Sequence, residues 1–210
     1  MIAIVDYDAG NIRSVVNALT RVGAEDVLLT ADREKLRAAD KVILPGVGEA
    51  STAMQALRDC GLADFIPSLE QPVLGICVGA QLMCAGSEEG NVRCMGIFPA
   101  EVRRFRETPS EKVPHMGWNS LWQPAVTKSG GSDTSSEIFS SPLFAGLRQG
   151  GYVYFVHSYY PELCPNTIAA ATHGIDFSAA LACDNFYACQ FHPEKSGPVG
   201  EQILKNFLSL

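Results

Sequence analysis

Cys77 is the residue of this sequence with the clearest setting for chemistry. It is the centre of Gly75-Ile76-Cys77-Val78-Gly79, which joins an apolar run to a segment of helical periodicity. Glycines on both sides of a nucleophile allow the sharp strand-to-helix turn that presents it at the edge of a sheet. The N-terminus of the next helix favours the thiolate, and the Val78 N–H would face a developing oxyanion. The alternative is a cysteine buried in a structural turn.

A nucleophilic cysteine needs a base, and Gln190-Phe191-His192-Pro193-Glu194 supplies a candidate. His192 follows an apolar run and precedes a proline, so we expect it at the end of a strand, facing a cleft. Glu194 is two residues away, close enough to orient the imidazole as the third member of a triad does. A lone histidine is more often structural than catalytic. Together with the elbow cysteine, however, the His-x-Glu pattern predicts a Cys77-His192-Glu194 triad.

The first half of the chain contains the elements that would position Cys77. Short apolar runs alternate there with segments that have apolar residues at helical spacing. The expected strands are residues 2–5, 27–29, 42–44 and 72–76, and the expected helices are residues 11–21, 49–60 and 80–84. This alternation predicts a mainly parallel sheet with helices on both faces, and such sheets carry their sites at the carboxyl edge.

The second half consists of short strand-like runs separated by turn residues, a pattern typical of mixed or antiparallel sheet. The expected strands are residues 102–106, 113–121, 137–140, 152–157, 168–173, 178–184 and 186–191. We expect a helix over residues 198–210, and the Ser- and Gly-rich stretch 127–136 indicates a mobile loop. No repeat or linker divides the chain. The fold class we expect is α/β, with one domain over residues 1–210 whose central, mainly parallel sheet carries added antiparallel strands.

The composition argues against several functional classes. The 210 residues carry a formal net charge of −7, and the one basic cluster, residues 103–106, has acidic neighbours, so we expect no nucleic-acid partner. No apolar run is long enough for a membrane span, and the first residues lack a secretory signal. The seven cysteines show neither zinc-site spacing nor a disulfide framework. We therefore expect a cytoplasmic protein with no metal and no cofactor.

Two motifs resemble the class I, or triad, glutamine amidotransferase family. They are Gly75-Ile76-Cys77-Val78-Gly79-Ala80-Gln81 and Phe191-His192-Pro193-Glu194. Further segments narrow the resemblance to the glutaminase subunits of imidazole glycerol phosphate synthases. They are Pro45-Gly46-Val47-Gly48, Pro114-His115-Met116-Gly117-Trp118-Asn119, Phe155-Val156-His157-Ser158-Tyr159 and His192-Pro193-Glu194-Lys195-Ser196. Departures from the family pattern, at Val78, Ala80, Ala188 and Glu49-Ala50, leave the triad untouched.

The resemblance implies a reaction and a role for each member of the triad. Cys77 would attack the carboxamide of L-glutamine, forming a γ-glutamyl thioester and releasing ammonia. His192 would act as general acid and base, held in its tautomer by Glu194. Gly46, Val47 and Gly48 would bring backbone N–H groups to the substrate, and Val47 or Gly48 would join Val78 in the oxyanion hole. An ordinary strand-to-helix turn is the alternative for this segment.

The resemblance also implies residues that bind the substrate. Gln81 lies one helical turn after the nucleophile, and with Glu89 it would contact glutamine. Glu88 is the alternative to Glu89, and the sequence does not decide between the two acids. The backbone of His157, Ser158 and Tyr159 would hold the α-amino and α-carboxylate groups, unless this segment is a plain edge strand.

A synthase partner is the last implication. The residues that would face it are Asn11, Met116, Gly117, Trp118, Asn119 and Lys195. Otherwise Trp118 is a core aromatic and Lys195 a solvated cation. The partner would be a cyclase subunit with a (β/α)₈ barrel, in a 1:1 heterodimer. It would use the ammonia to form imidazole glycerol phosphate and aminoimidazole carboxamide ribotide in histidine biosynthesis.

Three other functions compete with this interpretation. The chain could serve another synthase, such as the anthranilate or aminodeoxychorismate type. It could be a cysteine hydrolase that acts alone, such as a γ-glutamyl peptidase. A binding module that kept the fold and lost the chemistry is the third, and the presence of all three triad residues argues against it.

Overall fold

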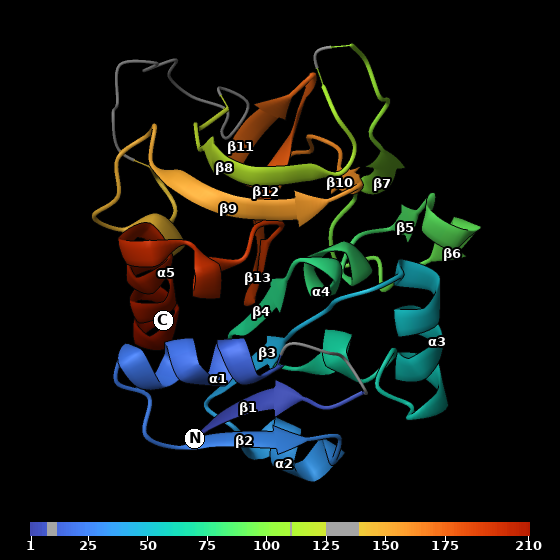
Figure 1. Ribbon diagram of the computed structural model, residues 1–210. Helices are drawn as coiled ribbons and strands as arrows, with labels where there is room; N and C mark the ends of the chain where they lie inside the picture. Colours follow the sequence, from blue (N-terminus) through green and yellow to red (C-terminus); the bar gives the residue numbers. More distant parts are fainter. Residues whose placement is uncertain (8–11, 110, 125–138) are drawn as a thin grey trace.

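A seven-stranded sheet forms the centre of the molecule (Figure 1). The computed structural model describes residues 1–7, 12–109, 111–124 and 139–210. The sheet order is β11-β12-β13-β4-β3-β1-β2, in which the last five strands are parallel and β11 and β12 are antiparallel additions. The strands are β1 (Ile2–Val5), β2 (Val27–Thr30), β3 (Lys41–Leu44), β4 (Val73–Ile76), β11 (Thr167–His173), β12 (Ile175–Cys183) and β13 (Phe186–Cys189).

Helices cover both faces of this sheet, which is why its inner strands are continuously apolar. Every residue of β1 and β4 is buried, as expected for parallel strands packed on both sides. The helices are α1 (Ile12–Arg21), α2 (Arg33–Ala38), α3 (Ala50–Asp59), α4 (Val78–Leu82) and α5 (Gly197–Ser209). Helices α1 and α5 lie side by side (Figure 1), joined by an Arg21–Glu201 ion pair of 3.3 Å. Right-handed crossovers place α2 and α3 on the opposite face.

Two smaller sheets adjoin the β11–β12 end of the central sheet (Figure 1). One has the order β10-β7-β5-β6, and the other pairs β8 with β9. Their strands are β5 (Gly86–Ser87), β6 (Val92–Arg93), β7 (Glu101–Arg104), β8 (His115–Ser120), β9 (Tyr152–His157) and β10 (Tyr159–Pro161). Short 3₁₀ turns, η1 (Ile66–Ser68), η2 (Glu89–Asn91), η3 (Pro142–Phe144) and η4 (Pro193–Lys195), complete the described elements.

The predicted α/β architecture is confirmed, with local corrections. Helix α2 was not predicted, and α4 begins at Val78, two residues earlier than expected. The strand expected over 137–140 is wrong for Phe139 and Ser140, which are not in a strand, and its first two residues lie outside the described residues. The loop expected at 127–136 also lies outside them. Among the described residues, no helix is both long and apolar enough to cross a membrane.

Candidate active site

Cys77 occupies the sharp turn between β4 and α4. Its backbone has φ +55° and ψ −111°, a conformation that non-glycine residues rarely adopt. The side chain is 5% exposed, and its N–H donates to the carbonyl of Cys189 on the neighbouring strand at 2.8 Å. Strained backbone of this kind persists only where the surrounding structure holds it, and it concentrates at functional sites. The turn therefore has the geometry expected of a nucleophile elbow.

Two glycines let the elbow pack against the turn that follows β3, and a third lets the elbow itself close. A Cβ on Gly79 would collide with the Leu44 carbonyl, and one on Gly75 would come within 2.9 Å of the Gly79 carbonyl oxygen. A Cβ on Gly46 would collide with the Gly79 nitrogen and lie 2.8 Å from the Val78 carbonyl carbon. Side chains at Gly46 or Gly79 would push the two turns apart, and one at Gly75 would open the elbow itself. The absence of a Cβ at Gly46 and Gly79 therefore lets Gly46 lie against the elbow.

His192 and Glu194 stand together just beyond the end of β13. The His192 Nδ1 and a Glu194 carboxylate oxygen are 2.8 Å apart, and both side chains are almost fully buried. The His192 N–H donates to the Tyr154 carbonyl at 3.0 Å, and the Ser196 hydroxyl donates to the His192 carbonyl at 2.6 Å. Since Nδ1 is engaged by Glu194, Nε2 is the ring nitrogen available to Cys77.

The environment of His192 favours its charged form. Burial opposes the charge, but hydrogen bonds and Coulomb attraction from Cys77 and Glu194 outweigh it and raise the pKa of His192 to about 9. The second carboxylate oxygen of Glu194 is buried and has no hydrogen-bond donor among the described residues. A buried carboxylate with one oxygen that accepts no hydrogen bond keeps its charge only if a cationic neighbour stabilises it. The pair is therefore poised as an imidazolium held by a carboxylate, next to the thiol.

A cavity of about 330 Å³ opens beside the triad. Most of the side chains and turns predicted from the sequence meet there. Its lining is Val47, Gly48, Cys77, Val78, Gln81, Glu89, Val156, His157, Ser158, Tyr159, His192 and Lys195. Gly46 lies behind this lining against the elbow, and Glu194 lies behind His192. The volume suits a ligand the size of an amino acid.

Gln81 and Gln190 form a buried amide pair next to the nucleophile. The Gln81 amide donates to the Gln190 side-chain oxygen at 2.9 Å and to the Tyr159 carbonyl at 3.0 Å. The Gln190 amide in turn lies 3.9 Å from the Cys77 sulfur. The Gln81 donor is thus used within the protein, which leaves its carbonyl oxygen for a ligand. The role of Gln190 was not predicted, since no local pattern shows that its side chain reaches a residue 113 positions away.

The two neighbouring acids point to different places. Glu89 lines the cavity, and one of its oxygens accepts from the Ala50 N–H, at the start of α3, at 2.8 Å. Glu88 is exposed and pairs with Arg103 at 3.1 Å. Burial raises the pKa of Glu89, against the effect of the Ala50 N–H, whereas the Arg104 N–H lowers the pKa of Glu88. Only Glu89 is placed to meet a ligand in the cavity.

Tyr7 is a second residue near the site that the sequence pattern did not indicate. It follows β1 at the carboxyl edge, and its buried hydroxyl donates to the Pro45 carbonyl at 2.6 Å. Burial, with a contribution from Cys77, raises the pKa of Tyr7. The phenol therefore stays a donor and fixes the peptide that precedes Gly46.

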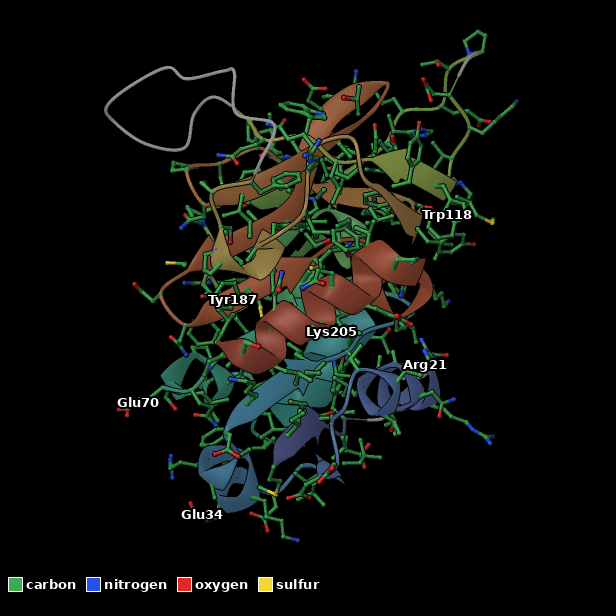
Figure 2. All side chains as sticks on the ribbon, turned by 90° about the vertical axis from the view of Figure 1, so that its left-hand side faces the viewer. Arg21, Glu34, Glu70, Trp118, Tyr187 and Lys205 are labelled. Atoms are coloured by element: carbon green, nitrogen blue, oxygen red, sulfur yellow. The ribbon has the colours of Figure 1, made fainter. Side chains whose placement is uncertain are left out.

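The outer surface of β8 is apolar and reaches the cavity lining through Tyr154 and Lys195. Met116 is 63% and Trp118 55% exposed, and Figure 2 shows Trp118 projecting at the margin of the molecule. Trp118 packs edge-on against Tyr154, over which the amine of Lys195 lies at 6.0 Å. Gly117 and Asn119 lie on the inner side of the strand, and the Asn119 amide donates to the Thr172 carbonyl. Asn11 lies outside the described residues.

The described residues contain no group of three histidine, cysteine or carboxylate side chains arranged to hold a metal ion. All seven cysteines are free thiols.

Comparison with known proteins identifies the family of this site. The profile of the family described as glutamine amidotransferase class-I matches residues 3–210. A Bacteroides fragilis protein called imidazole glycerol phosphate synthase subunit HisH is 53% identical over 210 residues, covering 100% of this chain and 99% of that protein. Proteins of the same name from Bacteroides thetaiotaomicron and Shewanella oneidensis are 51% and 42% identical. They align with all of this chain and with 99% and 96% of their own lengths.

Two solved structures share the fold at lower identity. A putative GMP synthase component from Thermoplasma acidophilum has a TM-score of 0.70 at 22% identity, covering 99% of this chain and 92% of that one. A crystal structure described as a glutamine amidotransferase has a TM-score of 0.70 at 20% identity, covering 100% and 98%. The predicted class I fold is thus confirmed. This chain belongs to the class I glutamine amidotransferase family and, within it, to the group of imidazole glycerol phosphate synthase subunits HisH.

Proposed function

We propose that this chain is the glutaminase subunit of an imidazole glycerol phosphate synthase. It hydrolyses L-glutamine to glutamate and ammonia and passes the ammonia to a cyclase subunit. The cyclase forms imidazole glycerol phosphate and aminoimidazole carboxamide ribotide in L-histidine biosynthesis. The observation that carries the proposal is the Cys77-His192-Glu194 arrangement beside a cavity of amino-acid size.

The first half of the reaction releases ammonia. The Cys77 thiolate attacks the side-chain carboxamide carbon of glutamine, and the carbonyl electron pair moves onto the oxygen. The Val78 N–H, at the first position of α4, and an N–H of Val47 or Gly48 stabilise this oxyanion. His192, as imidazolium, gives its proton to the nitrogen while the C–N bond breaks. Ammonia leaves and a γ-glutamyl thioester remains on Cys77.

The second half regenerates the thiolate. Neutral His192 accepts a proton from water, whose oxygen attacks the thioester carbon. The C–S bond breaks, glutamate is released, and the imidazolium–thiolate pair is restored. Throughout, Glu194 keeps the proton-carrying Nδ1 toward itself, so that Nε2 faces the reacting atoms.

Recognition of glutamine combines a carboxylate with backbone groups. Glu89 uses one oxygen for the Ala50 N–H and has the other available for the substrate ammonium group. The Gln81 side-chain oxygen supports the same group. Backbone of Ser158 and Tyr159 also lines the cavity and receives the α-carboxylate. Both charges that free glutamine carries thus have partners in the cavity.

Replacing Glu89 with glutamine tests this assignment. The amide keeps an oxygen for the Ala50 N–H but loses the charge that binds ammonium. We expect the KM for glutamine to rise about 10- to 100-fold, the range of one charged hydrogen bond, with kcat within about threefold. The matched control is Glu88→Gln, which removes the neighbouring charge outside the cavity and should leave both constants unchanged. Equal effects of the two substitutions would contradict the assignment.

The proposed cyclase partner binds the outer surface of β8 and the cavity mouth. Met116, Trp118 and Lys195 supply an exposed apolar and cationic surface next to the exit for ammonia. Direct transfer is needed because free ammonia is protonated in neutral water and then no longer acts as a nucleophile. The partner would also favour the conformer of Val47 and Gly48 that presents an N–H to the oxyanion. We place both proteins in the cytoplasm, a reducing compartment that suits seven free thiols.

Mixing this chain with the purified (β/α)₈-barrel cyclase should give a 1:1 complex and raise glutamine hydrolysis, more so when the barrel carries its nucleotide. Trp118→Ala should weaken the complex at least about tenfold, as expected for an exposed tryptophan at the centre of an interface. Leu29→Ala, an exposed apolar residue on the far edge strand β2, is the control and should not weaken it. A full glutaminase rate in the isolated chain, unaltered by the barrel, would instead favour a hydrolase that acts alone.

A further inference from the structure

A chain of hydrogen bonds runs from strand β8 to the wall of the glutamine cavity. The Asn119 amide lies 3.3 Å from His115 Nε2, and His115 Nδ1 lies 2.9 Å from His157 Nε2. His157 Nδ1 lies 2.8 Å from the Tyr159 carbonyl oxygen. The two histidines face each other in the β8–β9 register, and each is 6% exposed. None of these contacts belongs to the triad.

The direction of this chain follows from its last acceptor. The Tyr159 carbonyl has no hydrogen to donate, so His157 Nδ1 must carry one. Burial, against the effect of the Tyr159 carbonyl, lowers the pKa of His157 to about 3, and burial lowers the pKa of His115 to about 4. His157 is therefore neutral at pH 7 and its Nε2 accepts from His115 Nδ1–H. His115 Nε2 then accepts from the Asn119 amide, and both rings are Nδ1–H tautomers.

Aromatic neighbours keep the two rings from turning. His115 stacks on Phe155, with ring centres 4.8 Å apart, and on His173 at 4.2 Å. His157 meets the edge of Phe105 at 5.1 Å and stacks on Phe155 at 5.3 Å. Rotation of either ring would break these contacts together with the hydrogen bonds. The hydrogen-bond chain is thus a fixed support for the Tyr159 carbonyl.

The chain ends at a carbonyl that also belongs to the active site. The Tyr159 carbonyl accepts a second hydrogen bond, from Gln81, whose partner Gln190 lies next to the nucleophile. The carbonyl of Ser158 accepts from the Phe105 N–H at 3.0 Å. Because a trans peptide directs its C=O and N–H to opposite sides, the Tyr159 N–H points away from Phe105. Two carbonyls anchored in this way fix the orientation of the backbone at 158–159.

We propose that His157, backed by His115 and Asn119, is a positioning residue for glutamine binding. The chain holds the Tyr159 carbonyl, and through it the backbone N–H groups that receive the α-carboxylate, in the binding orientation. This inference rests on the proposed glutaminase function. It assigns the imidazole of His157 to substrate binding through the backbone, and not to proton transfer at Cys77.

Two amide substitutions separate the two ends of the His157 ring. In His157→Asn the amide nitrogen takes the position of Nδ1 and still donates to the Tyr159 carbonyl. In His157→Gln the amide reaches the position of Nε2, so it keeps His115 and loses Tyr159. We expect the KM for glutamine to rise at least about tenfold in His157→Gln and in His157→Phe, and less than about threefold in His157→Asn. In all three, kcat should stay within about threefold.

The matched control is His173→Phe, which keeps a ring stacked on His115 at a position outside the hydrogen-bond chain. This substitution should leave the KM for glutamine unchanged. Equal KM values for His157→Asn and His157→Gln, or a fall in kcat at constant KM, would overturn the inference. If the unsubstituted chain with its barrel partner does not hydrolyse glutamine, it is the proposed function that fails.

Nitrogen NMR of the unsubstituted protein supplies a test that needs no variant. Two-bond ¹H–¹⁵N correlations distinguish the Nδ1–H from the Nε2–H tautomer. At pH 7 both His115 and His157 should be neutral and protonated at Nδ1. An Nε2–H form of either ring would break the hydrogen-bond chain and refute the proposal, even where a His157 variant does not fold.

Discussion

Replacing Cys77 with alanine or serine should lower glutamine hydrolysis, and with it glutamine-dependent synthesis by the complex, by at least about 10³-fold while the fold stays intact. The loss is this large because Cys77 forms the thioester in the proposed mechanism, and what remains is the contribution of binding and of the oxyanion hole. Circular dichroism and thermal melting should match the unsubstituted protein, since the side chain sits in a turn stabilised by backbone contacts.

An electrophilic glutamine analogue should label Cys77 alone. Burial raises the pKa of Cys94 to about 11 and also raises the pKa values of Cys84 and Cys189, so those thiols stay protonated and unreactive. Cys60 is exposed but lies outside the cavity. Cys60→Ser is therefore the control, with full labelling and full activity. Label on Cys84 or Cys189 as the main product in mass spectrometry would refute the assignment of the nucleophile.

Loss of His192 should be nearly as severe. His192→Asn removes the proposed proton donor for the leaving ammonia, and kcat should fall about 10³- to 10⁴-fold. Glu194→Gln should cost at least about tenfold less, because in the proposed mechanism Glu194 orients the ring and transfers no proton. Steady-state rates of the two variants with the barrel partner present give the comparison. A mild effect of His192→Asn beside a severe kcat effect of His157→Asn would show that the base is misassigned.

The same residue should set the alkaline limit of activity. The pKa of His192 is raised to about 9, so the imidazolium proposed as the proton donor persists through neutral pH and is lost above that value. A plot of kcat/KM against pH should fall as the pH passes about 9. Because Glu194 contributes to the raised pKa, Glu194→Gln should move this fall to lower pH. An alkaline limb that is unchanged in Glu194→Gln would contradict the assignment.

Elements with a long or uniform pattern could be predicted from the sequence. The strand at 2–5 matches β1, and the helix at 49–60 contains α3 with Met54 and Leu57 buried as expected. Helix α2 was missed because it has six residues and one buried side chain, too few to show a period. The residue that could have indicated this helix is its N-cap, Asp32, whose side chain accepts hydrogen bonds from the N–H groups of Glu34 and Lys35.

Residues of the site were predictable where local sequence determines local geometry. The glycines specify the turn at Cys77, and the two-residue spacing specifies the pairing of His192 with Glu194. The structure brings the turn and the pair together beside one cavity. The contacts of Tyr7 and the pairing of His115 with His157 depend on sheet order and register, which the chain specifies only through tertiary packing. For the same reason the sequence did not decide whether Glu88 or Glu89 contacts glutamine. The directions of two adjacent side chains are known only when the backbone conformation is known.

The interlock of Gly46 with the elbow limits how this active site can change state. With the Pro45 carbonyl held by Tyr7 and Gly46 in contact with the backbone of Val78 and Gly79, the start of the turn cannot translate. A change of state would then be confined to rotation of the peptides at Val47 and Gly48, where φ is +87° at Gly48. Resting and stimulated forms would then have the same radius of gyration and the same secondary structure content. Small-angle X-ray scattering and far-ultraviolet circular dichroism would not distinguish the two forms. The catalytic switch would then operate without a change in the overall shape of the molecule.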